Sequence, residues 1–221
     1  MPQAKKPDLV EQDNLEVAQR LARERWRSLD PVRQAARAGA EARPSEDGQH
    51  VVSFSYFAQD IEVTHPGGEV GRAGGSDPLK LPEQILLLHY LCSGEPIPEG
   101  DRIIAYSEIP DGRFYEDAYQ RRTRNFLLAV FGEDPDKMAG AAKTLNAEPA
   151  ELGDVSVKVR ALPLIDIYPV LYRGDEEFPA DASVLLGERI RGFFNAEDTA
   201  VVAGLSVSYL ARAAAKLATG G

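Results

Sequence analysis

Apolar residues recur at helical spacing near the start of the chain, and arginines occupy the opposite side. This period predicts an amphipathic helix, whose apolar series is Leu15, Ala18, Leu21, Ala22, Trp26 and Leu29. Arg20, Arg23 and Arg27 are typical of a solvated helix face, although such a row can also contact nucleic acid. Asp30-Pro31 then predicts the start of a second helix, because aspartate caps well and proline fits the first helical position.

Alternating apolar and polar residues predict strands after a polar linker at 44–49. Residues 51–57 alternate with the period of a strand, and residues 61–64 form the predicted partner strand. Further along the chain, residues 155–159 alternate in the same way. Residues 164–172 are apolar on both faces, which predicts a strand in the centre of a sheet.

The most informative segment is the apolar run from Pro82 to Cys92. Pro82 and the acidic Glu83 suit the first turn of a helix. Beyond them the run has no polar face, which predicts a helix that protein encloses on all sides. Gly94 and Pro96 predict where this helix ends.

The second half of the chain predicts a strand over 102–109, a turn at Pro110–Gly112, and helices over 115–132 and 138–145. A long helix capped by Asn195 closes the pattern. Strands arrive in local pairs with helices grouped between them, which predicts an α+β fold. We expect a mixed or antiparallel sheet of local strand pairs around the buried central helix, with N-terminal helices and a long C-terminal helix.

Length and charge narrow the classes of function. The 221 residues suffice for a sizeable core, and we expect an N-terminal helical segment over 1–45 and an α+β domain over 46–221 that fold together. Twenty-five basic and 35 acidic residues give a formal charge of −10. This charge repels phosphate backbones and anionic lipid, so we expect neither nucleic acid nor a membrane as a partner. No export signal or spanning segment is evident, which predicts a cytoplasmic protein.

Cys92 is the single cysteine in the sequence. The chain by itself can therefore form neither an intrachain disulfide nor a four-cysteine cluster, and we expect no iron–sulfur cluster in it. The sequence also lacks the Gly-x-Ser-x-Gly, His-Glu-x-x-His and Walker patterns. No other cofactor follows from the residues.

His89 and Tyr90 are the first candidate ligand-binding residues, because they lie within the predicted buried helix. A buried histidine needs partners for both ring nitrogens. Most such histidines are core residues bonded to a carboxylate or a carbonyl. Since this helix offers His89 no local partner, we expect the partner to come from another element.

A second group of candidates is acidic. Asp175, Glu176 and Glu177 directly follow a buried strand, where carboxylates can hold a hard metal ion or act as acid and base. The alternative is a solvated turn. We expect His89 to lie near this turn or near Tyr115, with Arg113 orienting an anion. Tyr115 and Arg113 complete the candidate ligand-binding set.

Several spaced motifs carry a resemblance that extends from about Trp26 to Leu210. They are Leu86–Leu91, Glu108–Tyr115, Phe131-Gly132, Gly153-Asp154, Gly174–Ala180 and Glu197-Asp198. The chain resembles an uncharacterised bacterial domain of unknown function that occurs mainly in anaerobes. Some members of that family carry an additional N-terminal four-cysteine iron–sulfur domain. The resemblance implies redox or corrinoid-linked metabolism, but it supplies no catalytic residue, and Val184–Gly187 departs from the expected aromatic and acidic strand end.

Three functions follow from these observations and stay open at this point. The leading one is a ligand-binding or accessory protein of anaerobic redox metabolism, linked to corrinoid or iron–sulfur chemistry, whose partner is a small molecule or a redox protein. The second is a metal-assisted enzyme that uses His89 and the Asp175–Glu177 turn. The third is an acidic adaptor that binds other proteins through its N-terminal helices and acidic surface.

Overall fold

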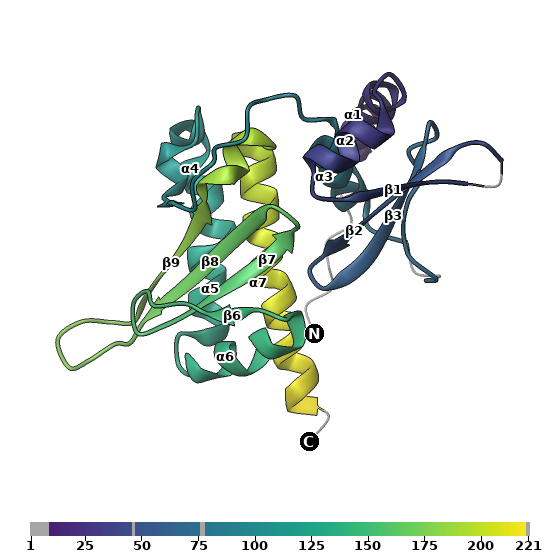
Figure 1. The fold of residues 1–221 in the computed structure, drawn as a ribbon. Coiled ribbons are helices and arrows are strands. Elements are labelled where there is room, and N and C mark those ends of the chain that lie inside the picture. Colours follow the sequence, from purple (N-terminus) through teal and green to yellow (C-terminus); the bar gives the residue numbers. More distant parts are fainter. Residues whose placement is uncertain (1–8, 46, 76–77, 220–221) are drawn as a thin grey trace. The chain divides into compact units, whose positions relative to one another are not determined.

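The computed structural model describes residues 9–45, 47–75 and 78–219, in two compact units (Figure 1). The first unit comprises residues 1–54 and 60–92, and the second comprises residues 55–59 and 93–221. The tip of one hairpin, residues 55–59, thus belongs to the second unit. The boundary predicted near residue 45 falls inside the first unit.

The described part of the first unit holds helices and a four-stranded antiparallel sheet in the order β1-β2-β3-β4. Its elements are α1 (Leu9–Arg27), α2 (Pro31–Arg37), β1 (Glu41–Pro44), β2 (His50–Tyr56), β3 (Gln59–His65), β4 (Val70–Arg72) and α3 (Leu81–Cys92). Asp30 caps α2 as predicted, because its carboxylate accepts hydrogen bonds from the backbone N–H groups of Val32 (2.9 Å) and Arg33 (3.2 Å). The pattern did not predict β1, which pairs with β2.

α3 forms the centre of the first unit, and its predicted burial is confirmed. Leu86, Leu87 and Leu88 are each at most 1% exposed. The helix packs against α1, α2 and β4. Apolar side chains on all sides can be buried only where protein surrounds the helix, which is why the run lacks a polar face.

The second unit contains a five-stranded antiparallel sheet in the order β5-β9-β8-β7-β6. Its described elements are β5 (Ile103–Ile104), η1 (Tyr106–Glu108), α4 (Gly112–Arg122), α5 (Arg124–Phe131), α6 (Asp136–Ala142), η2 (Lys143–Leu145), β6 (Glu148–Pro149), β7 (Val155–Leu162), β8 (Ile165–Tyr172), β9 (Asp181–Gly187), η3 (Glu188–Gly192) and α7 (Ala196–Thr219). α5, α6 and α7 pack against the sheet, and Figure 1 shows α5 and α7 behind it. β8 is the central strand, as its two apolar faces predict. The α+β class is confirmed.

Two predicted elements differ from the structure. The strand expected over 102–109 ends after β5, because Glu108 turns back to accept the N–H of Ala105 (3.0 Å) and the chain forms η1. The helix expected over 115–132 is divided into α4 and α5 at Thr123, whose backbone is not helical. The buried Thr123 hydroxyl donates to the carbonyl of Tyr119 (2.6 Å) at this break.

α7 confirms the predicted C-terminal helix and its cap. The side chain of Asn195 accepts the N–H of Asp198 (2.8 Å). By length and composition α7 is apolar enough to cross a bilayer, although core helices of soluble proteins pass the same test. Half of its apolar window is buried inside the protein, where α7 packs against α4 and α6. These contacts make α7 a core helix of the second unit.

The burial of α3 predicts that Leu87→Ala lowers the free energy of unfolding by about 2–5 kcal/mol, since the change removes a side chain that is 0% exposed. Urea unfolding followed by the fluorescence of Trp26, the single tryptophan of the sequence, measures the effect in the same unit. Leu21→Ala on α1 is the control, because Leu21 is 53% exposed. Equal midpoints for the two variants would contradict the core position of α3.

The environment of Cys92 predicts an unreactive thiol. Burial raises the pKa of Cys92 to about 12, although the charge of Arg25 acts in the opposite direction. Its thiolate fraction near neutral pH is then about a thousandfold below that of an unburied thiol, and the thiolate is the nucleophile. Alkylation by iodoacetamide at pH 8, followed by mass spectrometry, should be slow in native protein and fast in urea. Similar rates in both would show the thiol to be accessible.

Candidate functional site

The candidates on α3 take different positions. Tyr90 is 1% exposed, and its hydroxyl donates to the carbonyl of Ala38 (2.6 Å). Its ring lies 6.0 Å from the ring of Phe54. These contacts give Tyr90 a structural role in the core of the first unit. His89 is half-buried on the same helix.

The acidic turn lies between β8 and β9. The Asp175 carboxylate accepts the backbone N–H groups of Phe178 (2.8 Å) and Glu177 (2.9 Å). These two hydrogen bonds stabilise the charged form and lower the pKa of Asp175. Glu176 and Glu177 are exposed. The segment therefore has the features of a solvated turn, which is the alternative interpretation of the sequence.

Arg113 and Tyr115 are exposed in the first half of α4. They belong to the second unit, and the acidic turn belongs to the same unit. His89 belongs to the first unit, so its proximity to these residues stays a prediction. Among the residues that the structure describes, no three histidine, cysteine, aspartate or glutamate side chains are placed to hold a metal ion.

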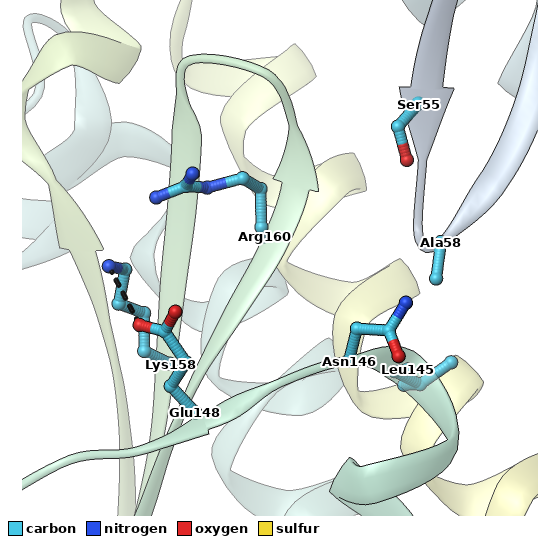
Figure 2. A pocket seen from close by; sticks show the side chains of 7 residues that line it. All are labelled: Ser55, Ala58, Leu145, Asn146, Glu148, Lys158 and Arg160. Atoms are coloured by element: carbon cyan, nitrogen blue, oxygen red, sulfur yellow. Dashed lines mark hydrogen bonds and ion pairs between the residues drawn. The ribbon is translucent and has the colours of Figure 1, made fainter.

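A cavity of about 170 Å³ in the second unit brings together residues that are far apart in the sequence. We call it the hairpin pocket, and its lining residues are Ser55, Ala58, Leu145, Asn146, Glu148, Lys158 and Arg160. They come from the tip of the β2–β3 hairpin, from η2 and β6, and from β7. Figure 2 shows the hairpin side chains across the pocket from Lys158.

The wall on β7 is basic. Lys158 and Arg160 are two positions apart, so both project from one face of the strand. The Lys158 ammonium lies 3.2 Å from a carboxylate oxygen of Glu148 and 3.9 Å from one of Asp166. Arg160 donates two hydrogen bonds to the Asp166 carboxylate (2.9 and 3.3 Å), which raise the pKa of Arg160. Both cations are thus paired with carboxylates.

The opposite wall depends on a hairpin tip with unusual backbone geometry. Phe57 and Ala58 have φ values of 46° and 60°, in the left-handed region. The tip is held there because the Phe57 ring stacks on Tyr209, with centroids 4.4 Å apart, and its N–H donates to the carbonyl of Ala161 (3.0 Å). Asn146, also in the pocket, has φ 52°. Positive φ at both loop positions is what a two-residue hairpin turn requires, and residues other than glycine and asparagine pay a steric cost there.

None of the residues that line the hairpin pocket was singled out from the sequence. The alternation of Val155, Val157 and Val159 implies that Lys158 and Arg160 share the other face of the strand, which is the one signal available. Nothing in the local pattern links that face to the hairpin tip, about a hundred positions earlier.

Comparison with models of protein families gives a match over most of the chain. A model of the family described as a domain of unknown function (DUF3786) matches residues 30–209. No curated protein and no solved structure matches the chain. The match covers most of both units, including every residue of the hairpin pocket.

The left-handed backbone at the pocket predicts that Ala58→Gly raises the free energy of unfolding by up to about 1 kcal/mol, because glycine adopts positive φ without a steric penalty. Urea unfolding followed by circular dichroism measures the change. Ala215→Gly, at an exposed position in α7, is the matched control and should lower stability by about 1 kcal/mol. A loss of stability in Ala58→Gly would show that the methyl group makes contacts that outweigh the strain.

Proposed function

This chain belongs to the DUF3786 family, and we propose that it is a ligand-binding accessory protein that binds a small carboxylate in the hairpin pocket. The observation that carries the proposal is the position of Lys158. Its side chain lines the cavity and is 27% exposed, and its ammonium group lies near the carboxylates of Glu148 and Asp166. A partly buried cation is suited to an anionic group of a ligand.

Glu148 is the group that a ligand would replace. Its side chain is 69% exposed, and its contact with Lys158 lies near the surface. An ion pair of this kind contributes only about 0–1 kcal/mol, so a ligand carboxylate can displace it at little cost. Lys158 would then exchange one carboxylate partner for another. Asp166 would keep the ammonium group oriented.

Polar groups on the other walls can recognise the remainder of the ligand. Ser55 carries a hydroxyl, and Asn146 carries an amide that both donates and accepts hydrogen bonds. The volume of about 170 Å³ corresponds to roughly five or six water molecules, so the cavity itself accommodates a group of a few non-hydrogen atoms. A short hydroxy or keto acid has this size and this set of polar groups.

The lining residues favour binding over catalysis. Ser55 is the one hydroxyl among them, and the lining set includes no histidine to activate it as a nucleophile. The resemblance to proteins of anaerobes, some of which carry an iron–sulfur domain, supports a place in cytoplasmic redox metabolism. In that setting the bound carboxylate would be a metabolite that this protein holds or senses for a redox partner.

Two variants with opposite expected effects test the proposal. Calorimetric titration with acetate, glycolate and pyruvate at constant ionic strength measures affinity. Lys158→Met should weaken binding about tenfold or more, because it removes the charged donor but keeps a side chain of similar length. Glu148→Gln should tighten binding, because it removes the competing carboxylate. Lys137→Met, at an exposed lysine paired with Asp134 outside the pocket, should leave affinity unchanged.

Two results would contradict the proposal. One is the absence of saturable binding for all three acids. The other is an equal affinity in Lys158→Met and in the unsubstituted protein. A structural role for Lys158 would make both pocket variants weaker, so the opposite signs separate ligand binding from loss of the fold.

A further inference from the structure

A second cavity, in the first unit, has a volume of about 320 Å³ and is rich in arginine. We call it the arginine pocket, and its lining residues are Gln19, Arg20, Arg23, Glu24, Arg27, Gly67 and Glu69. The first five lie on α1, and the last two lie in the turn between β3 and β4. The arginine row of the N-terminal helix thus faces a cavity.

The turn comes close to α1 because of a glycine. Gly68 has a φ of 70°, and a Cβ atom there would lie 3.0 Å from Cγ of Arg23 and 3.4 Å from Cδ1 of Trp26. The indole N–H of Trp26 donates to the carbonyl of Thr64 (2.9 Å), which ties the helix to the end of β3. The wall formed by Gly67 and Glu69 is therefore held against the arginines.

Two polar atoms of the first unit, one on a lining residue and one on a neighbour of Trp26, have no hydrogen-bond partner in the described structure. They are Nε of Arg23 and Nε2 of His65, and both are buried. The His65 ring stands edge-on to Trp26, with centroids 5.1 Å apart. A buried guanidinium N–H without an acceptor costs free energy, and Arg23 also lines the pocket, so its guanidinium group has donors to offer an anion there.

The charges around the pocket favour an anion. Three arginines outnumber two glutamates, and the carboxylate of Glu24 is already paired with Arg20 (2.9 Å). Glu69 is held by the Thr64 hydroxyl and lies near Arg23 and Arg27, and these contacts lower the pKa of Glu69. The lining side chains of the arginine pocket thus carry a formal charge of +1, whereas the whole chain carries −10.

We propose that the arginine pocket binds the phosphate group of a small phosphorylated molecule. The planar guanidinium group matches phosphate oxygens with paired donors, and three such groups project from one helix face. The volume corresponds to roughly ten water molecules, which holds a phosphate with a short substituent. The concave shape and the carboxylates of Glu24 and Glu69 disfavour a continuous nucleic-acid backbone, which would pass close to both.

Calorimetric titration at constant ionic strength tests this site. The probes are inorganic phosphate and glycerol 3-phosphate, and stronger binding of the ester identifies a phosphorylated metabolite as the source of the phosphate group. Arg27→Gln should weaken binding about tenfold, and Arg23→Lys should do the same, because lysine keeps the charge but loses the paired donors. Glu24→Gln should tighten binding. Arg33→Gln, on the exposed face of α2, is the control.

Trp26 fluorescence in urea shows whether each variant keeps the fold, and Arg27→Gln, an exposed position, keeps the test valid if Arg23→Lys does not fold. Lys158→Met should bind phosphate normally, which separates this site from the hairpin pocket. Equal phosphate affinity in Arg27→Gln and Arg33→Gln would overturn the proposal. So would the absence of saturable phosphate binding, or tighter binding of a single-stranded RNA oligonucleotide than of either phosphate probe.

Discussion

The aromatic contact between Phe57 and Tyr209 is the interaction on which the hairpin pocket depends. The rings stack 4.4 Å apart, with 20° between their planes, and Tyr56 stands edge-on to both. This packing holds two consecutive residues in the left-handed region, where an isolated hairpin with these side chains would be strained. Ser55 and Ala58 face β7 as a consequence. Without the contact, Lys158 would lie on one open face of a strand.

Both cavities collect basic side chains in an acidic chain, and each basic group has a carboxylate nearby. In the hairpin pocket Lys158 meets Glu148, and in the arginine pocket Arg20 meets Glu24. These exposed pairs contribute little to folding. They leave cationic side chains on the walls of both cavities, although the formal charge of the chain is −10.

Three buried tyrosines of the core donate their hydroxyl protons to backbone carbonyls, which marks them as structural residues. Tyr90 donates to a backbone carbonyl, and so do Tyr106 and Tyr119, whose rings stack 3.9 Å apart. Burial raises the pKa of Tyr106 to about 12 and raises the pKa of Tyr119 as well, so both keep the proton that they donate. A buried hydroxyl that donates to a backbone carbonyl stabilises the packing of the core, and this bond explains why the hydroxyl is there.

The sequence by itself determined the elements whose own side chains indicate how deeply they are buried or where they begin. α3 is apolar on every side, β8 is apolar on both faces, and Asp30 and Asn195 cap helices through atoms a few residues away. Asp111 also takes the positive φ that its turn requires.

Tertiary structure decided the rest, including the break at Thr123 and both cavities. Ser55, Asn146 and Lys158 line one cavity because a hairpin tip packs on Tyr209. Arg23 and Glu69 line another because Gly68 allows the close approach of a turn. A local pattern reports how deeply its own element is buried. It carries no information on which distant elements meet, because that depends on packing between side chains that are far apart in the sequence.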